Sequence, residues 1–200
     1  MSIKNIIFDL GGVVFNWQPS LLLSSLFNNK KIEDTIVENL LKQSDWEKLD
    51  QGVLSREDAI KNSILRSGLE REYFETFFNH IPEALSLIQD TVDIIYNLKQ
   101  KGYNLFVLSN MHIEFAKYLI SEYNFWDQFN DIVFSCDVKM IKPNTNIYQL
   151  LLERNNLNPN QCLFIDDTKI NLDTAENLGI TTIQFTNSAD LKEKLSKLNI

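Results

Sequence analysis

The sequence predicts an α/β protein, with a parallel sheet covered by helices and a helical segment inserted near its beginning. From Thr91 onward, short apolar runs alternate with amphipathic stretches, which is the pattern of repeated strand–helix units. A first apolar run, Ile6–Phe8, stands near the start, and residues 18–85 show helical patterns only. We therefore expect a core domain formed by residues 1–17 and 86–200, with residues 18–85 packed as a helical cap domain.

The first expected strand is the run Ile6–Phe8, which is followed at once by Asp9, Leu10 and two glycines, Gly11 and Gly12. Glycine allows tight turns and close approach of the backbone to a ligand. A carboxylate that only solvates a loop needs neither a buried strand before it nor glycines after it. We therefore interpret Asp9 as a candidate nucleophile on a rigid base.

The insertion is expected to contain helices separated by polar turns, with Gly52 and Gly68 as breaks. The expected helices are Leu21–Phe27, Ile32–Lys42, Arg56–Ser67 and Arg71–Phe78. This stretch is too long for a simple loop and carries its own apolar positions. Its aromatic residues are expected to build the interior of the cap rather than a ligand site: Trp46, Phe74, Phe77 and Phe78.

After the insertion the chain is expected to alternate between helices and strands. In order, these are a helix capped by Thr91 and closed by Gly102, strand Leu105–Leu108, helix Ile113–Tyr123, strand Ile132–Phe134, a helix starting at Pro143, strand Cys162–Ile165, helix Ile170–Leu178, strand Thr181–Phe185, and helix Ala189–Leu198 opened by Ser188. Such alternation predicts a parallel sheet with any ligand beyond the carboxyl ends of its strands.

The composition indicates a folded globular chain. Of 200 residues, 44% are hydrophobic, which is enough for a sizeable core. The formal net charge of −8 argues against nucleic acid or an anionic membrane as a partner. No segment reaches the ~18 apolar residues of a membrane span, and no signal-peptide pattern precedes Asp9, so a cytoplasmic location is expected. Cys136 and Cys162 lack metal-site or redox spacing and are interpreted as packing residues.

Three further polar segments stand at or beside expected strand ends, as Asp9 does. Alone, each has a simpler explanation: Ser109–Asn110 is a strand-ending turn, Lys142 a solvated lysine, and Asp166–Asp167 a pair at a helix start. Together, and in this order, they favour one functional site. For His112, a surface position at a helix start is favoured over contact with substrate.

Taken in order, these segments resemble the motifs of the haloacid dehalogenase superfamily, whose members are mostly Mg²⁺-dependent phosphatases working through a phospho-aspartate. The matching segments are Phe8–Val13, Leu108–Asn110, Lys142–Pro143, and Phe164–Asp167 with Asn171 and Leu178–Gly179. The resemblance covers nearly the whole chain. It implies a three-layer, Rossmann-like core in which the strands of the first, second and fourth motifs lie side by side beneath the cap.

The resemblance implies that Asp9 attacks phosphorus and that Mg²⁺ is held by Asp9, the backbone carbonyl of Gly11, and Asp167. Asp166 is expected either to bind the metal through water or to orient Asp167. Asn171 is expected to support the metal indirectly. Carboxylates so close together would repel one another, and a divalent cation resolves that repulsion.

The same resemblance implies which residues hold the phosphoryl group. Ser109 and the backbone of Asn110 are expected to hydrogen-bond it, and Lys142 is expected to add a positive charge. Gly12, in the glycine turn, is expected to lie against the phosphate. Trp17 stands at the cap entrance, where contact with substrate and ordinary packing remain equally open.

One position departs from the pattern of most phosphatases in the superfamily. Two residues after the nucleophile they carry a second Asp, which protonates the leaving oxygen and later activates water, whereas this chain has Gly11. Glycine moves no proton, and general acid–base catalysis is worth about 10²–10⁴-fold. We therefore expect leaving groups that need little protonation, such as an anomeric sugar phosphate, an acyl phosphate or an aryl phosphate.

The chain looks most like the subgroup of the superfamily with Asp-Leu-Gly at the first motif, which includes bacterial sugar-1-phosphate phosphatases. Trp46, Asp50 and Gly52 also resemble the cap of that subgroup. The partner is thus expected to be a small phosphorylated metabolite, with a hexose 1-phosphate as the first hypothesis. Monomer and homodimer both remain open.

Three other functions are compatible with parts of this pattern. A 2-haloacid dehalogenase would use Asp9 to attack carbon without a metal, but it gains nothing from the Asp166–Asp167 pair. A non-catalytic protein that binds a phosphorylated metabolite would keep the pocket without turnover. The cap helices also have the periodicity of a partner-docking surface.

Overall fold

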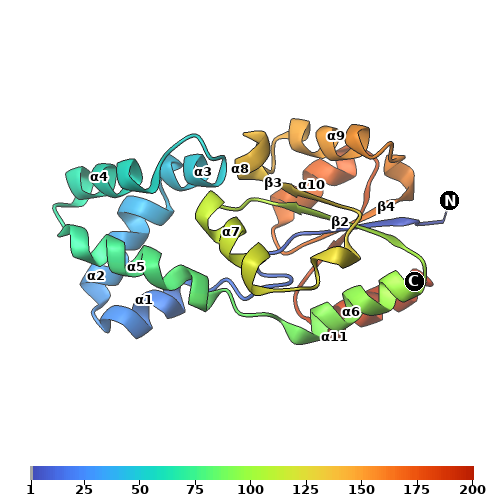
Figure 1. The fold of residues 1–200 in the computed structure, drawn as a ribbon, viewed down its shortest axis with the longest axis horizontal. Helices are drawn as coiled ribbons and strands as arrows, with labels where there is room; N and C mark the ends of the chain where they lie inside the picture. Colours follow the sequence, from blue (N-terminus) through green and yellow to red (C-terminus); the bar gives the residue numbers. More distant parts are fainter. Residues whose placement is uncertain (1) are drawn as a thin grey trace.

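The computed structural model of the protein describes residues 2–200, and in this part of the chain it contains a five-stranded parallel sheet with helices on both faces (Figure 1). The strand order is β3-β2-β1-β4-β5. The strands are β1 (Asn5–Phe8), β2 (Asn104–Ser109), β3 (Asp131–Phe134), β4 (Cys162–Asp166) and β5 (Thr181–Gln184). The expected three-layer α/β fold is confirmed.

Strand β1 lies at the centre of the sheet. Phe8, its last residue, pairs with Val107 of β2 on one side and with Ile165 of β4 on the other. The Asp9 amide continues the ladder by donating to the Ile165 carbonyl at 2.9 Å. The strands of the first, second and fourth motifs are therefore neighbours, as expected, and parallel pairing places their carboxyl ends at one edge.

The alternation of side chains along the strands creates two hydrophobic cores, one on each face of the sheet. On one face, Ile6 and Phe8 pack in a cluster with residues of α6 (Gln89–Gln100), α7 (Ile113–Glu122) and α11 (Ser188–Lys197). On the other, Ile7 packs with residues of α9 (Thr145–Arg154) and α10 (Lys169–Asn177). Figure 1 shows α6 and α11 on the opposite side of the sheet from α9 and α10.

The helices between β1 and α6 gather at the end of the molecule beyond α7 (Figure 1). They are α1 (Pro19–Phe27), α2 (Lys30–Ile36), the π-helical turn Val37–Leu41, α3 (Ser44–Asp50), α4 (Arg56–Ser67) and α5 (Arg71–Ala84). The chain enters and leaves this region side by side, since the Asn16 amide donates to the Ser86 carbonyl at 2.8 Å. Phe74, Phe77 and Phe78 are buried in its interior, as expected.

Several helix bounds differ from the sequence expectation. The helix expected over Ile32–Lys42 is divided between α2 and the π-helical turn, and α5 extends through Pro82 to Ala84. The short helix α8 (Ser135–Val138) was not expected, and neither was α3. Two 3₁₀ turns, Trp126–Gln128 and Pro159–Gln161, precede strands β3 and β4. Short segments carry too few apolar positions to show a helical period.

The expected helix starts were wrong at three places. Helix α6 begins before Thr91, whose buried hydroxyl instead meets that of Ser188 at 3.0 Å. Helix α9 begins after Pro143, because Asn144 caps it by accepting a hydrogen bond from the Asn146 amide. Helix α11 is capped by Asn187, not opened by Ser188. Asn competes well with Ser and Thr for the cap position, so residue type alone does not decide between adjacent candidates.

Within residues 2–200, no helix has the length and apolar character needed to cross a membrane.

Candidate active site

Three aspartates meet at the carboxyl edge of the sheet. Asp9 follows β1, Asp166 ends β4, and Asp167 comes directly after it. One carboxylate oxygen from each of the three lies within 4.8 Å of the others. Asp9 and Asp166 are buried, whereas Asp167 is exposed. The expected convergence of the first and fourth motifs is therefore present in the structure.

Lys142 lies between two of these carboxylates. Its Nζ is 2.9 Å from Asp9 Oδ1 and 2.7 Å from Asp166 Oδ2, and only 3% of the residue is exposed. The interpretation of Lys142 as a solvated lysine is thus excluded. Burial by itself lowers the pKa of Lys142, but the charges of Asp9 and Asp166 outweigh that effect and hold it above its usual value.

Asn110 holds the backbone of Lys142 in place. The Asn110 amide group donates to the Lys142 carbonyl at 2.9 Å, and its side-chain oxygen accepts from the Lys142 amide at 2.8 Å. This pair of hydrogen bonds joins the second motif to the third. The sequence suggested a phosphate contact for the Asn110 backbone but gave no indication of this bracing role for its side chain.

The Asp166 carboxylate is fully engaged by the protein. Besides Lys142, it accepts hydrogen bonds from the Thr168 amide at 2.7 Å and from Asn171 Nδ2 at 3.2 and 3.1 Å. The Asn171 carbonyl in turn accepts from the Tyr148 hydroxyl at 3.0 Å. Asn171 therefore contacts Asp166 directly, and this network orients the acidic pair.

Asp9 and Ser109 face the centre of the site. Burial raises the pKa of Asp9 to about 6; Lys142 opposes this rise and the Asp166 charge adds to it. The Ser109 hydroxyl, at the end of β2, is buried without a hydrogen-bond partner among residues 2–200. A buried hydroxyl without a partner is costly, so this donor is available to a ligand that enters the site.

The donor set fits Mg²⁺. Magnesium prefers hard oxygen ligands and binds through one or two carboxylates, keeping other positions for water and phosphate. Within residues 2–200, the Asp167 carboxylate accepts only a 3.2 Å hydrogen bond from the Thr168 hydroxyl, which leaves its other lone pairs for a metal ion. Partial burial and the neighbouring Asp166 charge raise the pKa of Asp167, which marks a local excess of negative charge. A divalent cation relieves such an excess.

Gly12 allows the glycine turn to approach Asp167 closely. Its φ of +76° lies in the left-handed region, and a Cβ at this position would be 2.5 Å from Asp167 Oδ2. The Gly12 amide donates to the Phe15 carbonyl at 2.8 Å. Gly12 thus allows the left-handed turn and its close approach to Asp167, while its own N–H is hydrogen-bonded within the turn.

Replacing Gly12 with alanine should weaken Mg²⁺ binding. Alanine in this conformation costs about 1–2 kcal/mol, and the added carbon would displace the Asp167 carboxylate. Thermal unfolding with and without Mg²⁺ measures both effects: the variant should melt lower and gain less from Mg²⁺ than the wild type does. Gly68→Ala is the matched control, because Gly68 has a φ of +67° but no atom within 4 Å of an added Cβ. An equal Mg²⁺-induced gain in all three proteins would contradict the prediction.

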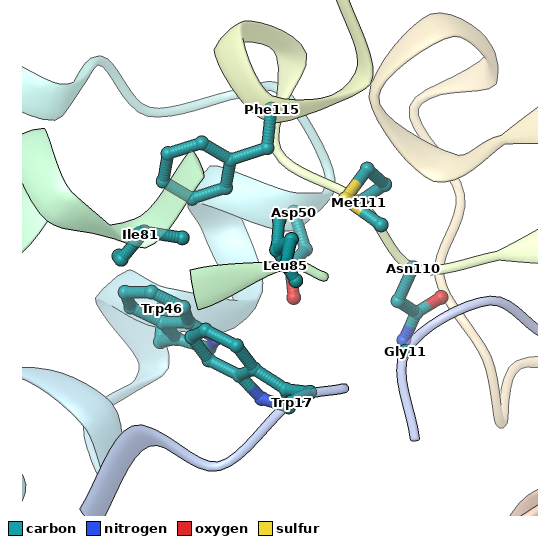
Figure 2. Close-up of a pocket in the computed structure, with 9 residues that line it drawn as sticks. All are labelled: Gly11, Trp17, Trp46, Asp50, Ile81, Leu85, Asn110, Met111 and Phe115. Carbon is teal, nitrogen blue, oxygen red and sulfur yellow. The ribbon is translucent and has the colours of Figure 1, made fainter. Parts of the chain in front are cut away.

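A cavity of about 60 Å³ lies between the core and the helices of the insertion (Figure 2). Most of its lining is apolar, and its polar side-chain groups are those of Asp50 and Asn110 and the indole N–H groups of Trp17 and Trp46. The lining residues are Gly11, Trp17, Trp46, Asp50, Ile81, Leu85, Asn110, Met111 and Phe115. The rings of Trp17 and Trp46 stack with centroids 5.9 Å apart. Trp46, expected only as an interior residue of the cap, therefore also forms a wall of this cavity.

Asp50 resembles a residue of the subgroup's cap in the sequence but was given no chemical role there, although it lines the cavity. Burial raises the pKa of Asp50 to about 7, with further increases from the charges of Asp9 and Glu47 and a decrease from Lys142. The spacing of Trp46 and Asp50 could have indicated this position, because residues four apart lie on the same face of a helix. The sequence did not predict helix α3, so this shared face was not predicted either.

The surface position expected for His112 was wrong. Only 3% of this residue is exposed, and its ring packs between Phe115 and Phe78, with centroids 4.8 and 6.5 Å away. Burial lowers the pKa of His112. The helix start itself was placed correctly, because α7 begins at Ile113.

Comparison with known proteins places the chain in a family. The model of the haloacid dehalogenase-like hydrolases matches residues 6–185. The protein therefore belongs to the haloacid dehalogenase-like hydrolases, and the resemblance of its four motifs to this superfamily is confirmed.

Individual relatives agree with this assignment. The chain is 25% identical over 207 residues to a D-ribitol-5-phosphate phosphatase of Bacteroides thetaiotaomicron, with 97% of each chain covered. A sesquiterpene phosphatase of Aspergillus oryzae is 22% identical over 185 residues, which cover 92% of this chain and 91% of that one. A family enzyme of Bacteroides thetaiotaomicron, solved with magnesium and inorganic phosphate, has the same fold, with a TM-score of 0.71, 22% identity, and 93% and 96% of the two chains covered.

Proposed function

We propose that this protein is a Mg²⁺-dependent phosphatase that hydrolyses a small phosphorylated metabolite through a phospho-aspartate on Asp9. The observation that carries the proposal is the arrangement of Asp9, Lys142 and Asp166 beside the exposed carboxylate of Asp167. It combines a nucleophile, a buried positive charge and free oxygen ligands at one edge of the sheet. The magnesium and phosphate bound by a family member of the same fold support it.

The metal would be held by Asp9, the backbone carbonyl of Gly11, and Asp167. When bound, it supplies positive charge against the phosphoryl oxygens. Asp166, held by Lys142 and Asn171, orients the acidic pair and keeps Lys142 in position.

The phosphoryl group would be held by the protein's own donors. The Ser109 hydroxyl, which has no hydrogen-bond partner among residues 2–200, and the backbone N–H of Asn110 would donate to its oxygens, and the Lys142 ammonium would balance its charge. Asp9 then attacks in line with the leaving group. Because phosphoryl transfer depends mainly on positioning and electrostatics, this arrangement supplies most of the required catalysis.

We further propose that residues 1–17 and 86–200 form the core domain and that residues 18–85 form a cap over the site. The support is that Trp46 and Asp50 of the insertion line the same cavity as Gly11 and Asn110 of the core. Substrate selection would then depend on both parts, with Trp17 contacting the substrate where they join.

Two substrate classes have support. A hexose 1-phosphate follows from the Asp-Leu-Gly subgroup that the first motif resembles. A phosphate monoester with a largely apolar leaving group is favoured by the cavity itself, because its lining offers few polar groups to the several hydroxyls of a sugar. These are the Asp50 carboxylate, the indole N–H groups of Trp17 and Trp46, and the Asn110 side chain, which is already hydrogen-bonded to the Lys142 backbone. A buried hydroxyl without a partner costs about 1–3 kcal/mol, so a hexose would bind poorly against the apolar walls.

A panel of phosphoesters tests the proposal. We expect hydrolysis with Mg²⁺ and a fall to background when a chelator removes it, because the single positive charge of Lys142 is already shared between Asp9 and Asp166 and does not offset the further charges of Asp167 and the phosphate. The panel should contain hexose 1-phosphates, pentitol phosphates, and aryl and prenyl phosphates, with released phosphate as the measurement. Activity that survives chelation, or release of halide from 2-chloropropionate, would instead support a dehalogenase. Metal-dependent binding without turnover would support a binding protein.

A further inference from the structure

We propose that Asp50, from helix α3 of the insertion, is the general acid and base that the core lacks at Gly11. This inference rests on the proposed phosphatase function and concerns a step that the core residues leave without a proton donor. In this arrangement the insertion supplies the proton donor, so the active site has all of its catalytic residues only while the insertion is packed on the core.

The core carboxylates are already committed to other tasks. Asp9 is the nucleophile, and every oxygen of Asp166 accepts hydrogen bonds or an ion pair from Lys142, Thr168 and Asn171. Asp167 lies against Gly12 on the metal side of the site. None of these side chains is free to exchange a proton with a leaving group in the cavity.

Within residues 2–200, Asp50 is the one acidic or basic side chain that lines the cavity between Gly11 and the insertion. Figure 2 shows Asp50 near the centre of the lining residues, partly overlapped by Leu85, with Trp17 below it and Asn110 and Gly11 to one side. No hydrogen bond or ion pair engages this carboxylate within the described part of the chain. A polar group that lines an enclosed cavity usually has a hydrogen-bond partner. We therefore expect the Asp50 carboxylate to hydrogen-bond a group of the substrate when the substrate binds.

The backbone of Asp50 is held to the core, which gives its side chain a defined position. The Ser135 hydroxyl donates to the Asp50 carbonyl at 2.5 Å and accepts a hydrogen bond from the Met111 amide at 2.9 Å. Ser135 is buried and begins α8, next to the end of β3. A single hydroxyl thus connects Asp50 with the segment that follows the second motif.

The turn after Asp50 docks tightly on α8. Lys139 Nζ donates to the Gly52 carbonyl at 2.8 Å, and the Gln51 side chain donates to the Lys139 carbonyl at 2.7 Å. A Cβ on Gly52 would lie 2.7 Å from the Cys136 carbonyl oxygen, so only glycine permits this approach. A proton donor must be held within hydrogen-bond reach of its target, and these contacts supply the required rigidity.

The protonation state of Asp50 also suits the role. Burial is the main reason that its pKa rises to about 7; Asp9 and Glu47 raise it further and Lys142 lowers it. A group with a pKa near the working pH is partly protonated before the reaction and partly ionised after it, which is the condition for efficient proton transfer in both directions.

The reaction balances with Asp50 in both half-reactions. In the first, an Asp9 oxygen forms a bond to phosphorus, the ester P–O bond breaks, and the leaving oxygen takes the electron pair and the proton of Asp50. In the second, water attacks phosphorus and gives its proton to the Asp50 carboxylate. The P–O bond to Asp9 breaks, and phosphate, the Asp9 carboxylate and protonated Asp50 are restored.

The test compares two aromatic substrates of similar size, 4-nitrophenyl phosphate and benzyl phosphate. Nitrophenolate leaves without a proton, whereas benzyl alkoxide needs one. Asp50→Asn should lower kcat/KM for benzyl phosphate by about 10²–10⁴-fold and for 4-nitrophenyl phosphate by less than about tenfold. Because the variant also lacks the base that activates water, 4-nitrophenyl phosphate should give a burst of nitrophenolate followed by slow turnover, with phosphoenzyme accumulating.

A second variant tests whether the missing function is proton transfer. At Gly11 the nearest atom to an added Cβ is Trp17 Cβ at 3.9 Å, so the core has room for a side chain there. Gly11→Asp, introduced into Asp50→Asn, should restore benzyl phosphate hydrolysis by about tenfold or more. A structural defect at Asp50 would not be repaired from this position. Glu72→Gln, at an exposed carboxylate of α5 that does not act on the pKa of Asp50, should leave the ratio between the two substrates unchanged.

Folding is checked in metal-free protein. The pKa of Asp50 is raised in the folded state, so its ionisation costs stability as pH rises from about 4 through 7. Asp50→Asn removes this cost, so the melting temperature of the variant should equal or exceed that of the wild type at pH 8.

An equal loss of kcat/KM for both substrates, or no loss of kcat/KM, in such a folded variant overturns the role of Asp50. Failure of the proposed phosphatase function is a different result, in which the wild type itself turns over neither substrate.

Discussion

Asp9→Asn should lower the hydrolysis of every phosphoester by more than about 10⁴-fold, as loss of a nucleophile does in other covalent enzymes. The amide keeps the shape of the side chain but has no anionic oxygen to attack phosphorus. Neither of the two neighbouring carboxylates would replace Asp9, because Asp166 is occupied by Lys142 and Asn171 and Asp167 would hold the metal. Steady-state rates with released phosphate measure the loss, and acid quenching with labelled substrate should trap a phosphoenzyme in the wild type only.

The control for this result is a carboxylate of the same type outside the site. Asp173 lies on α10 with 49% of its side chain exposed, and it pairs with Lys169 at 2.7 Å. Asp173→Asn should therefore keep the wild-type rate. A folded Asp9→Asn protein that retains its rate or still forms a labelled phosphoenzyme would remove Asp9 as the nucleophile, and with it the proposed mechanism.

Lys142→Met should both inactivate and destabilise the protein. Removing the ammonium leaves Asp9 and Asp166 as two buried carboxylates without their counter-charge. Breaking a buried ion pair from one side costs about 3–5 kcal/mol of unfolding free energy. Urea unfolding at pH 8 in the presence of a chelator measures this loss, and adding Mg²⁺ should recover part of it, since a cation again compensates the carboxylates.

The pH dependence of this loss has a definite sign. Burial already raises the pKa of Asp9 and Lys142 opposes this rise, so without Lys142 the pKa of Asp9 in the folded protein should rise further. The folded variant then holds a proton that the unfolded chain has released, and stability is lost as pH increases through the raised pKa. The deficit of the variant should therefore be larger at pH 8 than at pH 5. Lys169→Met, at an exposed pair, should show no measurable change at either pH. An equal deficit at both pH values would show that lost packing, not charge, accounts for the effect.

Local patterns in the sequence were sufficient to place the strands and most of the motif residues. The apolar runs before Asp9 and Asp166, and the run that ends at Ser109, correspond to β1, β4 and β2. Parallel strands joined by helices bring their carboxyl ends to one edge. The alternation of strands and helices therefore predicted the edge of the sheet at which these residues lie, whereas the neighbouring positions of β1, β2 and β4 were implied by the resemblance to the haloacid dehalogenase superfamily.

Other features depend on contacts between segments far apart in the chain, and only the tertiary structure decided them. Lys142 is a surface lysine by local pattern, and it becomes a buried counter-ion because Asn110 holds its backbone beside β4. Asp50 reaches the cavity because α3 docks on α8 through Ser135. The pKa values and burial of these side chains depend on neighbours that are close in space but far apart in the sequence. Contacts of this kind between the insertion and the core produce no periodic pattern in the sequence, so they could not be predicted from it.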